Sequence, residues 1–533
     1  MVHILILVYL ICINLHKPED IKNRNNTYQI HRRGAIEVTM SLAKDGNHNN
    51  NGEQGRCSHF LVVAYGIQGH INPARTLARR LAQIGGCTAT LSVPLSDHRR
   101  MFPSHENSCE EVSDGLISYI PFSDGRDDGS WPMDSEDRVQ RHKANLRSLS
   151  AVVNGLAASG RLVTCMVCTL SMTVVVEVAR EHQLPFVVYW IQPATILATY
   201  YHYFHGHEKL IVQHDTNPTY EVNLPGLHPL RICDMPTFFT EKTQSYLSKM
   251  VLQALRELFE QMHQEKSIVV LVNTFDALED VALKAMQPYM DVFAVGPAVP
   301  PLGALQHKNE NEAQIHLFKH DEKNCMEWLN AQLEKSVIYL SFGSLLSYTK
   351  RQAEEILHGL QDHGQPYLWV VRKEGRAEEV DFCIREANAG KGMVVEWCDQ
   401  QKVLSHPSIG CFVTHCGWNS TLEAIMSGVP MLAVPSWSDQ PMNAFLVEKE
   451  WRVGIRAERD EEGVLTRGEL ARCLDLLMGG SEKAMQIRAN ANRLKERAHQ
   501  AVASDGPLET SLQNFIKSMQ NLNRTNQENK RLA

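Results

Sequence analysis

A strand, helix, strand succession near the start of the folded part constrains this chain most. Residues 59–66, HFLVVAYG, form an uninterrupted apolar run, as expected for a strand buried on both faces of a parallel sheet. Apolar residues then recur at helical spacing as far as Ile84, and Gly85-Gly86 ends the helix. Residues 87–93, CTATLSV, are the next predicted strand. This βαβ unit predicts an open α/β sheet whose ligands bind at the carboxyl ends of the strands.

The same alternation continues along the chain and restarts after a break, which predicts two doubly wound halves. The first half covers 57–297 and the second 325–515. Between them, 298–324 is rich in Pro and then in charge, with little periodicity, and is the expected linker. We expect 1–56 to be an extension outside the fold and 516–533 to be a frayed polar tail.

Composition narrows the class of protein. A chain of 533 residues is too long for one hydrophobic core. Its net charge of -8 gives no basic surface for nucleic acid. The 13 Cys follow no framework spacing, which indicates reduced thiols and a cytoplasmic protein. No G-x-G-x-x-G follows a predicted strand, so a dinucleotide cofactor is not expected.

The N-terminus leaves two interpretations open. Residues 4–13 are apolar, about the length of a signal-peptide core, but no basic segment precedes them and no small-residue cleavage site follows. The alternative is an extension upstream of the folded part, with Met40 as a second possible start. No other segment is apolar for long enough to span a bilayer, so we expect no stable membrane association.

Residues 411–430 place a strand, a turn and a helix in the order expected of an anion site. Gly417 can approach a ligand closely, and Asn419 and Ser420 stand beside the first free N–H groups of the helix. The site suits a diphosphate, although the same side chains are also common helix caps. Glu423 can accept two ribose hydroxyls or can complete a Ser-x-x-Glu capping box.

Other candidates are weaker when each is taken alone. Trp397 can stack on a base, but a single tryptophan is more often part of a core. Asp439 and Gln440 can bind sugar hydroxyls or form a turn, and 341–344, SFGS, is a strand-to-helix turn of a common kind.

A metal site is not expected. The cysteines and histidine that suggest one, Cys398, Cys411, His415 and Cys416, match no recognised zinc spacing.

His70 is the candidate catalytic base. It stands in a Gly-His-Ile-Asn-Pro loop at the end of the first predicted strand, and histidine titrates in the range that a base needs. Because a single histidine is more often structural or solvated, its position at the ligand-binding edge is the argument for the role.

In their fixed order these segments resemble the plant family of UDP-dependent glycosyltransferases. Residues 397–440 contain W-C-x-Q, H-P-S-I-G-x-F-x-T-H-C-G-W-N-S, E-x-x-x-x-G-V-P and D-Q. The segments QGHINP, LPGL, VNTFDALE, VGP and GLQDHGQPYLWVVR also follow the family order, from about 58 to 515. Residues 162–204 further resemble the branch with anthocyanin 5-O-glucosyltransferases and crocetin glucosyltransferase-like enzymes.

The resemblance implies a GT-B fold, with the acceptor site mainly in the N-terminal half and the UDP-sugar mainly in the C-terminal half. A glutamine at 440, where galactose users often have histidine, favours glucose. Carried onto this chain, the resemblance assigns uracil stacking to Trp397, with Cys398 and Gln400 in the same donor-binding set, the ribose to Glu423, the diphosphate to Ser344, His415, Asn419 and Ser420, and the sugar to Trp418, Asp439 and Gln440.

The implied reaction is an inverting transfer in which His70 takes the acceptor proton and no metal or other cofactor is needed. The partners are then a UDP-sugar and a small-molecule acceptor, with the protein expected as a monomer. One departure matters: where the family places an Asp to orient the base, this chain has Thr169. A carboxylic acid acceptor is already ionised near neutral pH, so we hypothesise carboxyl as well as hydroxyl acceptors. The alternative is a UDP-sugar-binding protein with weakened catalysis.

Overall fold

The protein is described from a computed structural model, which covers residues 58–103, 109–130, 135–170, 172–239, 246–265, 267–299, 322–343, 348–372 and 380–532. The predicted extension over 1–56 and most of the predicted linker over 298–324 lie outside these residues, and so does Ser344. Residues from Cys57 to the C-terminus form one compact unit. Among the described residues, no helix is both long and apolar enough to cross a membrane.

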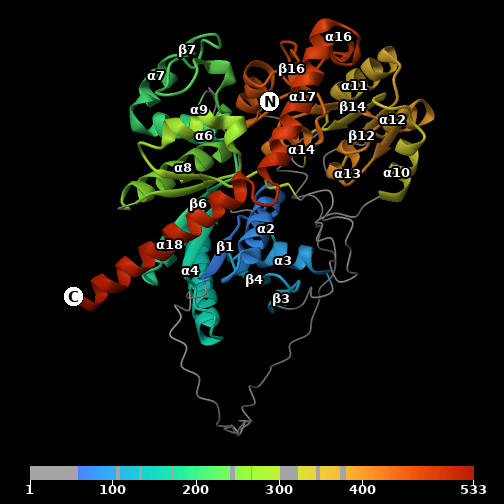
Figure 1. Cartoon of the computed structure of the whole chain (residues 1–533). Helices are drawn as coiled ribbons and strands as arrows, with labels where there is room; N and C mark the ends of the chain where they lie inside the picture. The colour runs from blue at the N-terminus through green and yellow to red at the C-terminus, as the bar shows by residue number, and fades with distance from the viewer. Residues whose placement is uncertain are drawn as a thin grey trace. The chain divides into compact units, whose positions relative to one another are not determined.

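The first half is built on an eight-stranded sheet, with strands in the order β10-β9-β6-β5-β1-β2-β4-β3. Figure 1 shows this half, with β1, β3, β4 and β6 labelled. All neighbours run parallel except β3, which pairs antiparallel with β4. The strands are β1 (Ser58–Val63), β2 (Cys87–Pro94), β3 (Val112–Ser113), β4 (Ser118–Phe122), β5 (Cys165–Thr169), β6 (Phe186–Trp190), β9 (Val269–Val272) and β10 (Asp291–Ala294).

The second half is built on a six-stranded sheet in which every neighbouring pair is parallel. Its order, β13-β12-β11-β14-β15-β16, is the doubly wound order of dinucleotide-binding folds. Two Rossmann-like halves are therefore confirmed. The strands are β11 (Val337–Ser341), β12 (Tyr367–Val370), β13 (Gly392–Val395), β14 (Ile409–Thr414), β15 (Met431–Ala433) and β16 (Gly454–Arg456).

Helices cover the faces of both sheets, and their ends follow the local sequence. Helix α11 begins after Thr349, whose side chain accepts a hydrogen bond from the Gln352 N–H, and ends at Gly364, which has φ of 76°. The helices of the first half are α2 (Gln68–Gln83), α3 (Leu95–Met101), α4 (Ser135–Ala158), α5 (Thr173–Glu181), α6 (Ala194–His202), α7 (Glu208–Gln213), α8 (Tyr246–His263) and α9 (Asp276–Met286). Those of the second half are α10 (Glu322–Asn330), α11 (Lys350–His363), α12 (Val380–Ala389), α13 (Gln400–Leu404), α14 (Trp418–Ser427), α15 (Gln440–Phe445), α16 (Arg467–Met478), α17 (Glu482–Ala501) and α18 (Pro507–Leu532).

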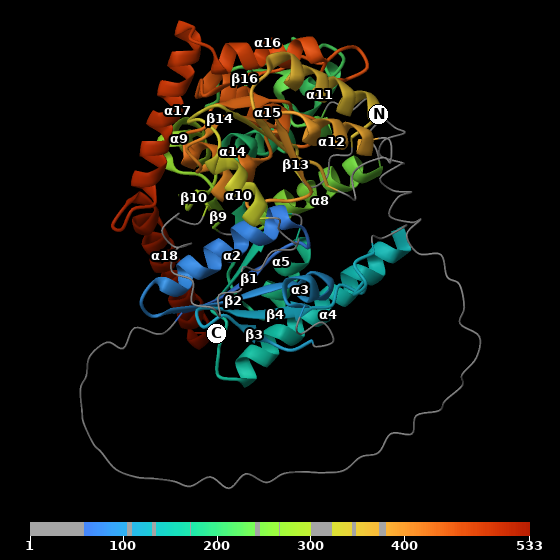
Figure 2. The same cartoon turned by 90° about the vertical axis from the view of Figure 1, so that its right-hand side faces the viewer.

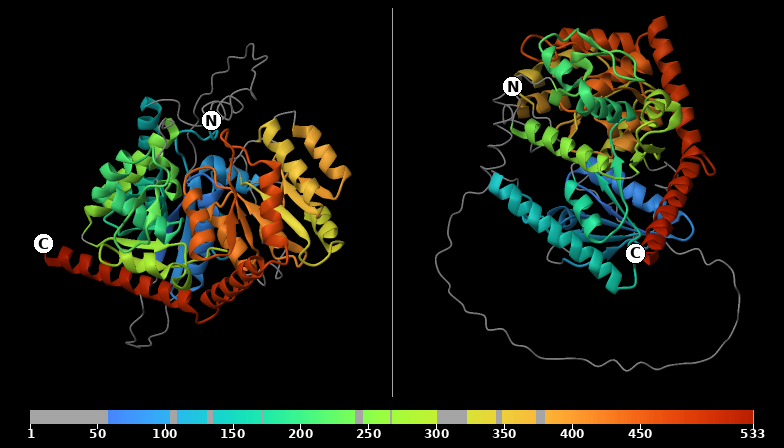
Figure 3. Two further views of the ribbon diagram at one scale, coloured as in Figure 1. Left: turned by 90° about the horizontal axis from the view of Figure 1, so that it is seen from above. Right: turned by 90° about the vertical axis from the view of Figure 1, so that its left-hand side faces the viewer.

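The last helix, α18, corrects the predicted polar tail. It continues through residues 516–532 and runs alongside the N-terminal sheet (Figures 1 and 3). Phe515, Ile516 and Met519 are buried in the core of that half, and the Phe515 ring lies 5.7 Å from the Phe60 ring. The expectation of a frayed end from 516 is therefore wrong for this segment, because apolar residues at helical spacing anchor it.

Candidate active site

The strand order of each sheet locates its ligand-binding edge. In a doubly wound sheet, ligands bind outside the carboxyl ends of the two strands between which the order reverses. In the N-terminal sheet these strands are β1 and β5, and in the C-terminal sheet they are β11 and β14. His70 lies in the first turn of α2, just after β1, and Thr169 is the last residue of β5. His415 and Gly417 follow β14 directly.

The histidine is held by the threonine at the end of the neighbouring strand. The Thr169 Oγ1 atom lies 3.0 Å from His70 Nδ1 and accepts a hydrogen bond of 3.1 Å from the Tyr65 N–H. Burial lowers the pKa of His70 to about 3, so its imidazole is neutral at pH 7. The structure thus places Thr169 where the sequence led us to expect the partner of the base.

With threonine as its partner, His70 can adopt either neutral tautomer. The surrounding contacts favour the tautomer protonated on Nε2, which cannot accept a proton at that nitrogen. A hydroxyl can either accept from an Nδ1–H or donate to a bare Nδ1. In the described residues, Thr169 Oγ1 already accepts from Tyr65, and its own proton has no acceptor other than Nδ1. If the hydroxyl donates, the histidine carries its proton on Nε2 and cannot take one there.

The start of α14 is shaped around the His415 imidazole. A Cβ added at Gly343, which has φ of 75°, would come within 2.6 Å of His415 Nε2, and one added at Gly417 within 2.5 Å. Thr421 makes the first intrahelical hydrogen bond, to the Gly417 carbonyl, so the N–H groups before it have no partner within the helix. Burial lowers the pKa of His415 to about 4, which leaves a neutral imidazole beside this helix end.

Gln400 connects the start of α13 to the first turns of α14. Its Nε2 atom donates to Ser420 Oγ at 2.9 Å and to Glu423 Oε2, and its Oε1 accepts from the Tyr339 hydroxyl at 3.2 Å. Burial raises the pKa of Glu423 to about 7, and the hydrogen bond from Gln400 opposes the rise. The carboxyl group is therefore poised to ionise near neutral pH.

Asp439 and Gln440 stand at the start of α15, and each is fixed by a neighbour. Asn443 Nδ2 donates to Asp439 Oδ2 at 2.8 Å and to the Cys416 carbonyl at 2.7 Å. Gln440 Oε1 accepts from the N–H groups of Ser436 and Trp437, so its Nε2 stays available as a donor. Burial raises the pKa of Asp439 to about 6.

Two residues of the predicted donor-binding set have side chains that point into the protein. Cys398 is 3% exposed in the core and lies 3.4 Å from the Tyr339 hydroxyl, so its thiol does not face a ligand. Trp418 is 4% exposed, and its indole donates to the Asn273 carbonyl at 2.8 Å. The predicted role of Trp418 at the sugar then falls to its backbone and stays a prediction. At both positions only the backbone is left to contact a donor.

Trp397 lies beside a cation that the sequence did not point to. The Arg372 guanidinium lies 4.5 Å from the centre of the Trp397 ring, as in a cation–π contact. Sequence reasoning also missed Tyr339, which holds Gln400, and Asn443, which holds Asp439. No motif marks these positions, because each acts through contacts that only the folded chain creates.

The two halves meet at the site itself. Asn419 Nδ2, in the first turn of α14, donates to the Gly69 carbonyl at 3.2 Å, immediately before His70. Thr237 and Ser438 also pair, since the Thr237 N–H donates to the Ser438 carbonyl and the Thr237 Oγ1 accepts from the Ser438 N–H. The anion site at α14 and the candidate base thus face the same space.

Two doubly wound halves whose ligand-binding edges face each other define the GT-B class of glycosyltransferases. Comparison with known proteins identifies the family. Its model, described as UDP-glucoronosyl and UDP-glucosyl transferase, matches residues 193–489. The chloroplastic crocetin glucosyltransferase of Gardenia jasminoides is 39% identical over 469 residues, which is 86% of this chain and 97% of that protein. The phloretin 4'-O-glucosyltransferase of Malus domestica is 40% identical over 478 residues, with 86% and 97% covered.

The fold also matches solved structures of glycosyltransferases bound to UDP. The crystal structure of Os79 from O. sativa in complex with UDP matches with a TM-score of 0.72 and 27% identity, over 86% of this chain and 100% of that one. The chain therefore belongs to the family of UDP-glucuronosyl and UDP-glucosyl transferases, and it is a UDP-glycosyltransferase of the plant type. The resemblance and the GT-B fold predicted from the sequence are both confirmed.

Proposed function

We propose that the protein is an inverting, UDP-glucose-dependent glucosyltransferase that acts on a hydroxyl or carboxyl group of a plant small molecule. The hydrogen bond from Asn419 to the Gly69 carbonyl carries this proposal, because it joins the start of α14 to the loop of His70. An acceptor bound at His70 then lies next to a sugar whose diphosphate is held at α14. The relatives named for the glucosylation of crocetin and phloretin support the choice of sugar and of acceptor class.

In this proposal the donor lies along the C-terminal edge. Trp397 stacks on uracil, Gln400 lies near the nucleoside and Glu423 accepts the ribose hydroxyls. The first N–H groups of α14, with His415, Asn419 and Ser420, hold the diphosphate, as helix N-termini hold anions. Asp439 and the free Nε2 of Gln440 bind the sugar hydroxyls. The sequence also assigns Ser344 to the diphosphate, a role that stays a prediction.

The reaction is a single displacement. The acceptor oxygen attacks the anomeric carbon from the face opposite UDP as the bond from that carbon to the diphosphate oxygen breaks. The acceptor proton passes to Nε2 of the His70 tautomer whose Nδ1–H donates to Thr169, because only in that tautomer is Nε2 bare. The configuration at the anomeric carbon inverts, and the transition state has oxocarbenium character. The helix N–H donors meet the charge that develops on UDP. A carboxylate acceptor has no proton to lose, so it needs the base less.

Product analysis tests the proposal directly. The purified protein would be incubated with UDP-glucose and a panel of flavonoids, phenols and carboxylic acids, and products would be identified by mass spectrometry. A mass gain of one hexose on at least one acceptor is expected. Donor binding would be measured separately by calorimetry, and a protein that binds neither UDP nor UDP-glucose would contradict the donor assignment.

A second candidate function rests on Thr169. Because its contacts favour a His70 protonated on Nε2, the chain could bind a UDP-sugar with weak or lost transfer. UDP-glucose binding without any product on the full acceptor panel would favour this alternative.

The pH dependence of donor binding tests Glu423. Its pKa is raised to about 7, and ribose hydroxyls bind its ionised form more strongly, so donor affinity rises with pH as the carboxyl loses its proton. The KM for UDP-glucose is expected to fall by about tenfold between roughly pH 6 and 8. In Glu423→Gln the KM should be high and flat over the same range. A wild-type KM that does not change with pH would contradict the assignment of Glu423 to the donor site.

We further propose that transfer needs no metal. Among the described residues, no group of three His, Cys, Asp or Glu side chains is arranged to hold a metal ion, and the α14 donors supply the positive field. Initial rates after dialysis against EDTA are expected to stay within about twofold of the untreated protein, and added Mg²⁺ should not raise them. A loss of rate that Mg²⁺ restores would overturn this prediction.

We propose that the enzyme acts as a monomer in the cytoplasm. Its cysteines within the described residues are all free, as in a reducing compartment. The relative from Gardenia jasminoides is named as chloroplastic, so the compartment is best tested by a C-terminal fluorescent fusion. A plastid signal would contradict the cytoplasmic assignment, and light scattering would report the mass in solution.

A further inference from the structure

A segment of the N-terminal half reaches the loop that carries the two proposed sugar-binding residues. Residues 232–239, which we call the bridging segment, form two short 3₁₀ turns, Ile232–Asp234 and Thr237–Phe239. The loop, residues 434–440, leads from β15 into α15. Two hydrogen bonds of 3.0 Å between Thr237 and Ser438 join the segment to the loop. The position of the loop therefore depends on both halves of the protein.

Ser438 adopts a backbone conformation that a residue with a side chain disfavours. Its φ is 62°, in the left-handed region that glycine adopts freely and other residues rarely do. Such a conformation persists where neighbouring contacts hold it. Thr237 supplies two of these contacts, since its N–H donates to the Ser438 carbonyl and its Oγ1 accepts from the Ser438 N–H. Thr237 therefore helps to keep Ser438 in the left-handed conformation.

The conformation of Ser438 sets the direction of the two residues that follow it, Asp439 and Gln440. Gln440 Oε1 accepts from the N–H groups of Ser436 and Trp437, and the Gln440 N–H donates to the Trp437 carbonyl at 3.2 Å. The turn thus closes around Ser438. A change of φ at Ser438 would rotate the chain on either side of it, and it would move the Asp439 carboxylate and the Gln440 amide together.

The bridging segment has anchors of its own on both halves. Asp234 is fully buried and pairs at 2.7 Å with Arg456, the last residue of β16. The Phe238 ring lies edge to face with the Trp437 ring, 5.2 Å away, and Phe239 is buried in the N-terminal core. These contacts fix the bridging segment against both sheets independently of its hydrogen bonds to the loop.

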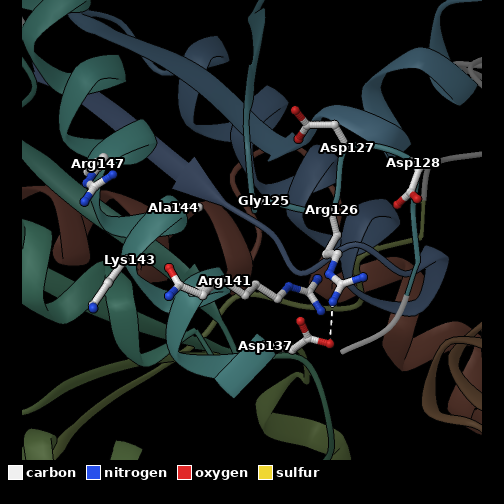
Figure 4. A pocket seen from close by; sticks show the side chains of 10 residues that line it. Gly125, Arg126, Asp127, Asp128, Asp137, Arg141, Lys143, Ala144 and Arg147 are labelled. Carbon is white, nitrogen blue, oxygen red and sulfur yellow. Dashed lines mark ion pairs between the residues drawn. The ribbon is translucent and has the colours of Figure 1, made fainter. Parts of the chain in front are cut away.

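The loop after β4 also leaves the N-terminal sheet at its ligand-binding edge, since β4 runs parallel to β2 and β2 to β1. With the first turns of α4, which lies beside β4 (Figure 2), it lines a polar cavity of about 570 Å³ (Figure 4). Arg126 pairs with Asp137 there. Arg141 pairs with Asp124 and points to the other side of α4 from Lys143. The cavity therefore offers a sugar no converging set of donors.

We propose that Thr237 is a positioning residue for the donor sugar. The inference rests on the proposed function, because it assumes that Asp439 and Gln440 bind the sugar hydroxyls. By holding Ser438 in the left-handed conformation, Thr237 directs these two side chains toward the sugar. The acceptor-binding half then takes part in recognition of the donor. The contacts proposed for the uracil, the ribose and the diphosphate lie elsewhere along the C-terminal edge and do not depend on Thr237.

A comparison of UDP-glucose with UDP isolates the contribution of the sugar. Thr237→Val keeps the branched side chain and the backbone N–H, but removes the oxygen that accepts from Ser438. Calorimetry is expected to show that this variant binds UDP-glucose about fivefold more weakly than the wild type and binds UDP equally well. Thr237→Ser, which keeps the hydroxyl, should bind both as the wild type does. Thr219→Val is the matched control, because Thr219 is exposed and its hydroxyl donates to Asn217.

The same measurements can contradict the inference. Equal weakening of UDP and UDP-glucose would overturn it, because the whole donor site would then be disturbed, and unchanged binding of both would overturn it as well. Initial rates keep the inference distinct from the proposed function. Glucose transfer by a Thr237→Val variant with unchanged donor binding would overturn the inference alone. A selective loss of affinity for UDP-glucose, in a protein that transfers glucose to no acceptor, would support the inference and count against the proposed function.

Discussion

Replacing His70 by alanine is expected to lower kcat for phenol and alcohol acceptors by about 10²- to 10⁴-fold, the range over which a positioned base accelerates a reaction. The wild-type imidazole is neutral, because burial lowers its pKa to about 3, and its ring is held by Thr169 at the acceptor edge. Carboxylate acceptors should lose much less, about tenfold or below, because no proton has to leave them. Initial rates with saturating UDP-glucose would measure both.

A second variant keeps this prediction independent of folding. His70→Gln can still hydrogen-bond Thr169 but offers no basic nitrogen, so it should lose hydroxyl transfer as His70→Ala does while melting at the wild-type temperature. An unchanged KM for UDP-glucose would show that the donor site is intact. Full activity of either variant on phenols would show that His70 does not accept the acceptor proton.

Much of the fold was predictable, because each half repeats one pattern. Apolar strands that alternate with amphipathic helices specify a parallel sheet, and the observed β1 (Ser58–Val63) and α2 (Gln68–Gln83) lie close to their predicted ranges. The short strands β4 and β16 were missed, since they carry no long apolar run. Helix α18 was missed as well, because its polar composition hides Leu512, Phe515 and Met519, which lie on one buried face.

The candidate site was also predictable only in part. The glycines and the helix start after β14 could be found from the sequence, because they stand in a fixed order with Asn419, Ser420 and Glu423, and a helix N-terminus with such donors binds anions. The directions in which the side chains point could not be found from the sequence. Trp418 and Cys398 stand in the signature, yet both point into the protein, toward Asn273 and Tyr339.

Replacing Thr169 by aspartate is expected to raise kcat for hydroxyl acceptors by about 10²-fold. Where an aspartate holds a catalytic histidine, its loss costs up to about 10⁴-fold, because the carboxylate fixes the tautomer and stabilises the imidazolium. Here Thr169 Oγ1 lies 3.0 Å from His70 Nδ1, so a carboxylate at this position reaches the same nitrogen. It would accept from Nδ1–H, leave Nε2 bare, and raise the pKa of His70 from its value of about 3.

Thr169→Asn separates the two effects of that carboxylate. The asparagine oxygen can accept from Nδ1–H and so can fix the tautomer, but it brings no charge and does not strengthen the base. If the tautomer alone limits the wild-type enzyme, both variants should gain activity on phenols to a similar extent. If basicity limits the wild-type enzyme, only the aspartate variant should gain activity, and its pH–rate profile should show a new ionisation absent from the wild type.

Because Thr169 is fully buried, thermal melting would check that each variant folds. The rates with carboxylate acceptors, which need no base, should change little in either variant. A folded Thr169→Asp with no gain on any hydroxyl acceptor would mean that the base is limited by something other than its partner.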